Sequence, residues 1–333
     1  MKVLFIGLGS IGQRHLRILK NLHKKKIDIY YLSNSNRNLV INDDLKAKKV
    51  KSLSKYYNIK KIKLSEIGAG FIDLTFITNP PFLHINYALK MAKLKSNLFI
   101  EKPLSDNLKG VKLLIKISKK NKIKIYSGYH LRFHPGIIKL KKLIDSKVLG
   151  KVISGLFYFG EYLPMTRLFV DYSKTHMAKK KFGGGATLSL SHQIDLCIHL
   201  LKNLRLTYSS ISKKSNLNIN ADDSCKIVFK DNRNSSFFLI QNFLDNPPDI
   251  FIKLNFEKGF SEWNYHQKTL TIYENGKKIK NFFFKKLERN HIFKKQIKFI
   301  LHDLKKPYKL NRNFYESVNC LKIIQKAKKI NTN

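Results

Sequence analysis

The stretch KVLFIGLGSIG, residues 2–12, decides the fold of the N-terminal part of the chain. Its first five residues are almost wholly apolar, as expected of a strand with both faces buried. Its last six match the pattern G-x-G-x-x-G, and a helical pattern of apolar residues follows over residues 10–22. A strand, a glycine-rich turn and a helix in this order predict a loop that binds the phosphates of a dinucleotide.

Each glycine of the pattern has a physical role. Gly7 permits the tight turn, Gly9 lets the backbone approach a pyrophosphate, and Gly12 allows the helix to pack closely on the strand. The first helical residues, Ser10 and Ile11, present unpaired N–H groups and the positive end of the helix dipole to the phosphates. We therefore predict that these five residues contact a bound dinucleotide. The alternative is a glycine turn with a structural role only.

A chain of 333 residues exceeds what one hydrophobic core usually organises, so we expect two domains. Residues 1–127 alternate strand-like and helix-like segments, which predicts an α/β fold with a doubly wound parallel sheet, a Rossmann domain. Its further strands are expected at 27–32, 71–77, 97–100 and 123–127, and its further helices at 84–94 and 108–120.

Residues 128–333 have a different texture and predict a second domain, of the α+β class. Alternating apolar and polar residues predict a mostly antiparallel sheet with strands at 152–159, 226–229, 237–241, 250–256, 269–273 and 278–284. Asn275-Gly276, between the last two strands, is a strong hairpin signal. One long helix is expected at 186–201, and one or two helices follow from residue 290. Packing of these last helices back on the N-terminal domain stays open.

The composition is strongly basic: 65 Lys and Arg stand against 22 Asp and Glu, a formal net charge of +43. The basic residues occur along the whole chain in short runs, without a basic tail or an Arg-rich arm. We therefore expect a generally basic surface and no nucleic-acid partner, with a functional polyanion site as the alternative. A general positive field would still attract phosphorylated or nucleotide-linked substrates.

Cysteine usage and hydropathy indicate the compartment. The three cysteines form no C-x-x-C pair and leave one over from any disulfide, which favours a reducing compartment and argues against a thiolate zinc site. No apolar stretch approaches the roughly 20 residues that a membrane span needs. The first strand begins at Lys2, which leaves no room for a signal peptide. We expect a cytoplasmic protein with no membrane partner.

The end of the second predicted strand bears on the cofactor. An acidic residue usually lies there in NAD-preferring Rossmann domains and binds the ribose 2′-hydroxyl. Residues 33–37 read SNSNR, with no acid and one arginine. Because hydroxyls and a guanidinium suit a 2′-phosphate, we expect Ser33, Ser35 and Arg37 to contact the cofactor, with NADP slightly favoured over NAD. A polar loop that only caps a helix is the alternative.

Further motifs make the chain similar to a known family. Thr78-Asn79-Pro80 ends a strand, His84 begins a helix, and Glu101-Lys102-Pro103 follows the next strand. Gly183-Gly184-Gly185 later precedes His192 and Asp195 on a helix. This pattern resembles the glucose–fructose oxidoreductase / inositol dehydrogenase / MocA (Gfo/Idh/MocA) family, densely over residues 1–135 and 183–201.

The resemblance implies a Rossmann domain followed by an open, mostly antiparallel sheet whose free face often mediates oligomerisation, so a homodimer or homotetramer is expected. The family exchanges hydride between a sugar or polyol carbinol and nicotinamide. The resemblance places Thr78, Asn79, Pro80, His84 and Glu101 at the cofactor. It also places Lys102 at the reacting hydroxyl and the cofactor ribose, and makes His192 the acid–base group.

Both of these last roles are chemically reasonable. A carbinol proton must leave as the hydride departs, so a group that titrates near neutrality should lie at that oxygen, and histidine is the usual choice. A lysine beside the cationic nicotinamide would have its ammonium form disfavoured, and it could polarise the oxygen or relay the proton.

The chain departs from the family pattern at one position. Many members carry Asp between the glycine triplet and the histidine, where this chain has Ser189. Asp195 lies three residues beyond His192, on the same helix face, where it could orient the imidazole, face substrate or serve packing. We expect Tyr129, Arg132, Ser189 and Asp195 on the substrate side, with interdomain packing as the alternative for the first two. A metal site made with His199 is not expected.

The opening GLGSIGQRHL and the helix LSHQID resemble those of family members that accompany cell-surface sugar biosynthesis. By analogy, the substrate is a sugar, a polyol, a nucleotide sugar or an amino-sugar derivative. Two alternatives stay open. One is a net non-redox reaction, such as glycoside cleavage, that uses bound cofactor transiently. The other is a cofactor-binding protein without turnover, which the serine at position 189 motivates.

Overall fold

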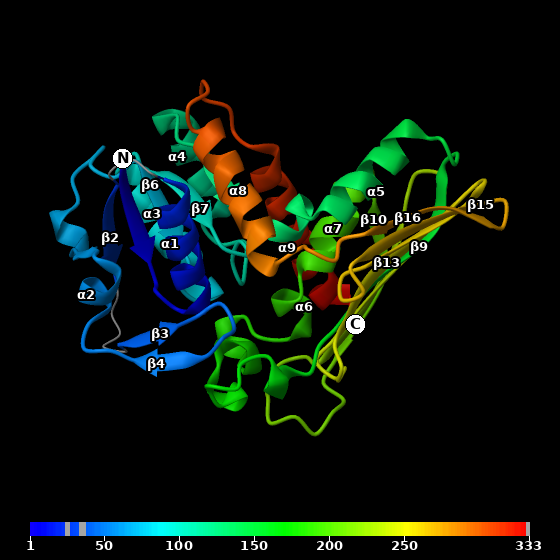
Figure 1. Ribbon diagram of the computed structural model, residues 1–333, viewed down its shortest axis with the longest axis horizontal. Coiled ribbons are helices and arrows are strands. Elements are labelled where there is room, and N and C mark those ends of the chain that lie inside the picture. The colour runs from blue at the N-terminus through cyan, green and yellow to red at the C-terminus, as the bar shows by residue number, and fades with distance from the viewer. Residues whose placement is uncertain (24–26, 33–37, 331–333) are drawn as a thin grey trace. The chain divides into compact units, whose positions relative to one another are not determined.

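The chain, as a computed structural model, is described over residues 1–23, 27–32 and 38–330 and divides into two compact units. The first unit holds residues 1–128 and 290–321. The second holds residues 129–289 and the chain from Lys322 onward. The predicted fold class is confirmed, because the first unit contains a parallel sheet and the second a mostly antiparallel one (Figure 1).

Six parallel strands form the sheet of the first unit, in the order β5-β2-β1-β6-β7-β8. They are β1 (Lys2–Ile6), β2 (Asp28–Leu32), β5 (Lys60–Lys61), β6 (Leu74–Ile77), β7 (Asn97–Ile100) and β8 (Ile125–Ser127). The order runs outward from β1 in both directions, so the topological switch point lies at the carboxyl end of β1. Open α/β sheets bind their ligands at this point.

Helices and one hairpin surround this sheet. They are α1 (Ser10–Leu22), α2 (Leu53–Tyr57), α3 (His84–Lys93), α4 (Val111–Asn121), α8 (Arg289–Asp303), the part of α9 (Arg312–Ile330) before Lys322, and the antiparallel pair β3 (Leu39–Ile41) and β4 (Ala47–Lys49). On one sheet face, Phe5 packs in a core cluster with Leu19 of α1 and Phe293 of α8. Leu4 and Ile6 point to the other face and are equally buried, and α3 lies against β6 and β7 with α4 beside it.

The second unit contains one eight-stranded sheet in the order β10-β11-β12-β9-β13-β14-β15-β16. Its strands are β9 (Val152–Gly160), β10 (Arg205–Ser212), β11 (Ser224–Lys230), β12 (Ser236–Asn242), β13 (Asp249–Phe256), β14 (Gly259–Asn264), β15 (Thr269–Glu274) and β16 (Lys277–Phe283). Neighbours pair antiparallel except β12 with β9. Helices α5 (Pro135–Ser146), α6 (Ala186–Ser189) and α7 (His192–Leu200) contact the sheet, and the Ala327 carbonyl of α9 accepts a hydrogen bond from Ser209 of β10.

The predicted hairpin between β15 and β16 is present. Asn275 and Gly276 have φ values of 48° and 78°, so both turn residues lie in the left-handed region that a tight hairpin requires. Asparagine and glycine adopt this region at the lowest steric cost, which is why the dipeptide predicted the turn correctly.

The prediction of one helix over residues 186–201 was wrong, because the chain forms two helices, α6 and α7. The break falls at Leu190 and Ser191. The Leu190 carbonyl accepts a hydrogen bond from the buried side chain of Gln241 on β12. Gln241 lies 51 residues further along the chain, so the helical pattern of apolar residues contained no sign of the interruption.

Several elements were not predicted from the sequence, among them the β3–β4 hairpin, α5, β10 and β14. Helix α5 did have local signals, since Pro135 occupies its first turn and the His134 side chain accepts a hydrogen bond from the Gly136 N–H at 3.0 Å. Within the part of the chain that the structure describes, no helix has the length and apolar character needed to cross a membrane.

Candidate functional site

The glycine loop joins β1 to α1 and has the shape that a diphosphate requires. Gly7 has φ of 92°, and its N–H donates to the Leu32 carbonyl at 3.2 Å. A Cβ on Gly12 would lie 2.4 Å from the Gly7 carbonyl oxygen, whereas a Cβ on Gly9 would meet nothing within 4 Å. Gly9 is also the N-cap of α1, and no side chain caps the helix there. The helix N-terminus, where Ser10 begins α1, can therefore receive an anion.

Thr78 and Asn79 lie beside this loop at the carboxyl end of β6. Thr78 Oγ1 donates to the Gly7 carbonyl at 2.5 Å, which ties β6 to the turn. The Asn79 backbone nitrogen would lie 2.8 Å from a Cβ on Gly7, so Asn79 fills the space behind the turn, and Pro80 follows it. Asn79 Oδ1 is buried and accepts no hydrogen bond from any described residue. Such an oxygen suits an N–H or O–H group of a ligand, and the residues present thus fit a dinucleotide.

His84 connects the loops that follow β6 and β7. Its Nε2 lies 2.8 Å from the Asn79 carbonyl oxygen and its Nδ1 lies 3.0 Å from the Pro103 carbonyl oxygen. Complete burial lowers the pKa of the imidazole below its ordinary value, although both carbonyls favour the protonated ring. His84 therefore holds the two loops together, and direct contact between His84 and a cofactor stays a prediction.

Glu101 and Lys102 lie just beyond the carboxyl end of β7. Glu101 is 6% exposed, and its Oε2 accepts a hydrogen bond from the Lys102 backbone N–H at 2.9 Å. Its Oε1 lies 2.7 Å from His15 Nε2. The carboxylate therefore points into the protein, while Lys102 is partly exposed. Cofactor contact by Glu101, predicted from the sequence, stays a prediction.

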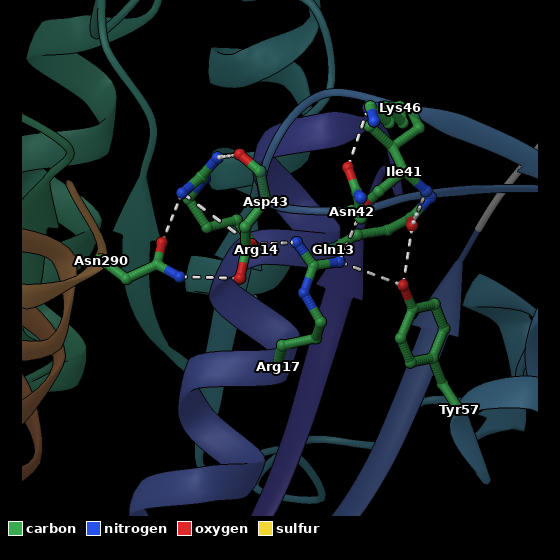
Figure 2. Close-up of polar contacts among 9 residues, drawn as sticks. All are labelled: Gln13, Arg14, Arg17, Ile41, Asn42, Asp43, Lys46, Tyr57 and Asn290. Carbon is green, nitrogen blue, oxygen red and sulfur yellow. Dashed lines mark hydrogen bonds and ion pairs between the residues drawn. The ribbon is translucent and has the colours of Figure 1, made fainter. Parts of the chain in front are cut away.

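Gln13 attaches the β3–β4 hairpin to the glycine loop. Its buried Nε2 donates to the Leu8 carbonyl at 2.9 Å and to the Leu39 carbonyl at 2.8 Å. Its Oε1 accepts from the Ile41 N–H and from the Tyr57 hydroxyl, each at 2.8 Å (Figure 2). All four hydrogen bonds that the amide can make are thus formed within the first unit.

A second polar group extends this attachment to the start of α8. Asp43 forms an ion pair with Arg17, and its Oδ2 accepts from the Asn290 side-chain amide at 2.7 Å (Figure 2). Arg14 donates to the Asp43 carbonyl at 2.8 Å and also contacts Asn290. Burial of the Asp43 carboxyl opposes its ionisation, but the hydrogen bonds from Arg17 and Asn290, together with the charges of Arg17 and Arg14, outweigh this effect and lower its pKa. These residues carry no recognisable signal in the sequence, because their partners are distant in the chain.

A cavity of about 240 Å³ lies in the same unit, near the carboxyl end of β2. It has apolar, aromatic and basic lining residues, namely Leu32, Lys61, Ile62, Lys63, Leu64, Tyr87 and Lys90. No carboxylate belongs to this lining, so its electrostatic character is positive. Ser33, Ser35 and Arg37, which the sequence predicts at the cofactor, lie outside the described residues.

The second unit brings His192 together with aromatic side chains. His192 begins α7 and is 4% exposed. Its ring meets the rings of Tyr129 and His130 edge-on, with centroid distances of 5.6 and 4.6 Å. The Tyr129 hydroxyl donates to Ser191 Oγ at 3.3 Å. These contacts fix the plane of the imidazole that the sequence predicts to be the acid–base group.

Arg132 and Asp195 form a buried, bidentate ion pair in this unit. Arg132 Nε donates to Asp195 Oδ2 at 2.7 Å, and Nη2 donates to Oδ1. Asp195 is fully buried and Arg132 is 8% exposed. Both carboxylate oxygens of Asp195 thus bind the guanidinium, whereas Ser189 lies on α6, partly exposed. Substrate contact by any of these residues stays a prediction.

Two of the three glycines before α6, Gly184 and Gly185, lie where a side chain would not fit. A Cβ on Gly185 would lie 2.1 Å from an oxygen of Asp222, whose carboxylate accepts from the Thr187 N–H at 2.8 Å. A Cβ on Gly184 would lie 2.5 Å from the Met177 carbonyl oxygen.

In neither described unit do three or more His, Cys, Asp or Glu side chains gather in a way that could hold a metal ion.

The N-terminal part of the chain is similar to a known family. Residues 1–129 match the family model described as an oxidoreductase family with an NAD-binding Rossmann fold. The chain is 27% identical over 215 residues to Oxidoreductase P35 of Formosa agariphila, a match that covers 63% of the chain and 65% of that protein. It is 29% identical over 152 residues to Myo-inositol 2-dehydrogenase of Thermotoga maritima, covering 45% and 42%. The chain therefore spans less than two thirds of the length of either relative.

A solved structure extends the similarity of fold to the whole chain. Levoglucosan dehydrogenase in complex with NADH and levoglucosan superposes with a TM-score of 0.83, covering 100% of this chain and 97% of that one. The sequences are 14% identical, so this likeness concerns the fold alone.

The glycine loop predicts opposite effects for two alanine substitutions. Gly12→Ala forces a Cβ against the Gly7 carbonyl and should lower the free energy of unfolding by about 1–3 kcal/mol. Gly9→Ala has room in the protein and should leave that free energy nearly unchanged, yet lower the affinity for NADH, because its methyl group occupies the approach to the helix N-terminus. Urea unfolding and calorimetric titration measure the two effects. Equal destabilisation by both substitutions would contradict this account of the loop.

Proposed function

We propose that the whole chain is an NAD(P)-dependent dehydrogenase acting on a CH–OH group of a sugar or polyol, because residues 1–129 match the model of the Gfo/Idh/MocA oxidoreductase family. The observation that carries the proposal is the uncapped N-terminus of α1 behind the open position at Gly9, with the unpaired Asn79 Oδ1 beside it. The names of the relatives, myo-inositol 2-dehydrogenase and levoglucosan dehydrogenase, support the substrate class.

The chemistry assigns separate roles to two residues. A bound nicotinamide accepts or returns the hydride. As the carbinol carbon loses hydride, its hydroxyl must lose a proton, and we assign that proton to the His192 imidazole. We assign to the Lys102 ammonium the stabilisation of the negative charge that develops on the substrate during hydride transfer. Tyr129 and His130 restrict rotation of the His192 ring and so favour a fixed direction for proton transfer.

The cofactor is NAD or NADP, and the basic cavity beside β2 favours NADP. Its apolar and aromatic lining suits an adenine ring, and Lys61, Lys63 and Lys90 supply the positive charge that a 2′-phosphate requires. This adds to the earlier expectation from the sequence of residues 33–37.

The double substitution Lys63→Ala/Lys90→Ala should lower NADPH affinity roughly tenfold, since two partly exposed ion pairs are lost. NADH affinity should change little, because NADH lacks the 2′-phosphate. Lys60→Ala is the matched control, because Lys60 is exposed and pairs with Asp28 rather than lining the cavity. Calorimetric titration with both cofactors measures the difference. Equal weakening of NADH and NADPH would show that the lysines do not read the phosphate.

For the substrate, we propose a phosphorylated or nucleotide-linked sugar used in cell-surface glycan synthesis. The net charge of +43 supports a phosphorylated substrate, because a positive field attracts anions. A net non-redox reaction is the alternative, and it would proceed on bound cofactor with no external oxidant. A protein without turnover is a further alternative, motivated by Ser189. The cytoplasmic location expected from the sequence also stays a prediction.

Lys102→Ala and His192→Asn should each lower kcat by about 10²–10⁴-fold, because each removes a group that handles charge or proton at the reacting oxygen. The assay follows NADH and NADPH formation with myo-inositol, glucose 6-phosphate and levoglucosan as probe substrates. His199→Asn, on the same helix α7, is the control and should retain the activity. Activity that survives both Lys102→Ala and His192→Asn would refute the assignment.

We also propose that the chain forms a homodimer or homotetramer through the face of the eight-stranded sheet that carries Phe238. Phe238 is 48% exposed, and it pairs across the sheet with Leu156 on β9. On the same strand, Tyr158 stacks on Phe251 of β13 at a centroid distance of 5.1 Å. These side chains form an apolar patch of the kind that subunit interfaces bury.

Phe238→Lys should shift the protein toward monomer in light scattering coupled to size-exclusion chromatography, because it places a charge within the apolar patch. Leu168→Lys is the control, since Leu168 is 77% exposed but lies outside the sheet. A wild-type protein that is monomeric at micromolar concentration would refute the proposal.

A further inference from the structure

We propose that His15 and Glu101 are positioning residues that hold the backbone of Lys102 in place for the reaction. The inference rests on the proposed role of Lys102. It concerns a buried group of contacts that links α1, the helix at the glycine loop, to the loop that carries the lysine.

The first contact is made by Glu101, whose carboxylate is turned inward. One of its oxygens accepts the Lys102 N–H at 2.9 Å, and the other lies 2.7 Å from His15 Nε2. A buried carboxylate is costly unless donors satisfy it, so both contacts are required for Glu101 to keep this orientation. Lys102 is the residue after Glu101, and its N–H binds the Glu101 carboxylate. A displacement of this carboxylate therefore moves the Lys102 backbone.

The second contact is made by His15, whose ring packs against three phenylalanine side chains. His15 is fully buried, and its ring meets Phe99 and Phe293 edge-on at centroid distances of 4.8 and 5.5 Å. Phe76 lies against it at 5.7 Å. Nδ1 has no hydrogen-bond partner among the described residues, so the one hydrogen bond of the ring points to Glu101. The three phenylalanines therefore fix the orientation of the His15 ring, and with it the position of the Nε2 atom that contacts Glu101.

The third constraint is Gly128, which follows β8. A Cβ at this position would lie 2.7 Å from Glu101 Oε2 and 2.8 Å from its Cδ. Gly128 is not among the glycines with positive φ, so space rather than backbone conformation explains the absence of a side chain. Its N–H donates to the Ile100 carbonyl at 2.8 Å, which keeps it close to Glu101. The Glu101 carboxylate thus lies between the His15 side chain of α1 and the backbone of Gly128.

Together these contacts hold the Glu101 carboxylate, and with it the Lys102 N–H, by groups within the protein. A displacement of about 1 Å in a catalytic group can cost about 10²-fold in rate. A purely structural role would instead lower stability and leave the position of Lys102 unchanged. These two possibilities differ in measurable ways.

The test compares His15→Phe, His15→Gln and Gly128→Ala with Thr75→Val. His15→Phe keeps the aromatic packing and removes the donor to Glu101. His15→Gln restores an amide donor near the position of Nε2. Gly128→Ala displaces the carboxylate without removing any of its partners. Thr75→Val is the stability control. Thr75 lies on β6, the strand next to β7, and the substitution removes its buried hydrogen bond to Ser96, which is 2.8 Å long.

Two readouts follow Lys102 itself. One is kcat and KM with the probe substrate that the wild-type protein turns over. The other is independent of turnover, namely the rate of reductive methylation of Lys102, measured by peptide mass spectrometry with and without saturating NADH. Calorimetry of NADH binding and urea unfolding accompany both, so loss of the fold or of the cofactor is recognised.

We expect His15→Phe and Gly128→Ala to lower kcat about 10²-fold with little change in KM or NADH affinity, and to alter the protection of Lys102 by NADH. His15→Gln should recover most of both. Thr75→Val should keep both at a similar loss of stability. The proposal is overturned if His15→Phe and Gly128→Ala behave as Thr75→Val does. If Lys102→Ala retains activity, the proposed function fails instead, and the methylation rates still decide whether His15 and Glu101 position Lys102.

Discussion

The close approach of α1 to the carboxyl ends of β1 and β6 is the constraint on which the first unit depends. Gly12 permits it, because any side chain there would collide with the Gly7 carbonyl and with Thr78 Oγ1. Once the helix begins at this point, its uncapped N-terminus faces the switch point of the sheet. The tight turn, the ligand-binding end of the sheet and the placement of Asn79 all follow from this packing.

Behind the surface that would meet a ligand, buried polar groups hold each functional loop. Gln13 connects the glycine loop to the β3–β4 hairpin, and His84 connects the loops after β6 and β7. His15 and Glu101 contact each other at the start of the loop after β7, which carries Lys102. Each group satisfies backbone N–H or carbonyl groups that irregular segments would otherwise leave unpaired. The ordering of the loops thus depends on polar side chains as much as on the apolar core.

The second unit uses the same physical means for a different geometry. A large antiparallel sheet carries two short helices, and the interruption between them places His192 at the first position of α7. Arg132, in the segment that leads to α5, and Asp195, on α7, form a bidentate pair in which the two buried charges neutralise each other. Such a pair is weak evidence for stability but strong evidence for a fixed geometry, since removal of either partner would leave the other charge buried.

The sequence by itself determined the two fold classes, the glycine loop and the hairpin at Asn275-Gly276, because these depend on local backbone geometry and on the period of apolar residues. It also predicted roles for Lys102 and His192, through short motifs that resemble those of a known family. Only the tertiary structure decided which polar side chains meet. His15 and Glu101 are 86 residues apart, and Arg132 and Asp195 are 63 apart. Residue periodicity reports which face of an element is buried, but the partner of a buried polar group depends on how distant segments pack. The break between α6 and α7, where Gln241 donates to the Leu190 carbonyl, escaped prediction for the same reason.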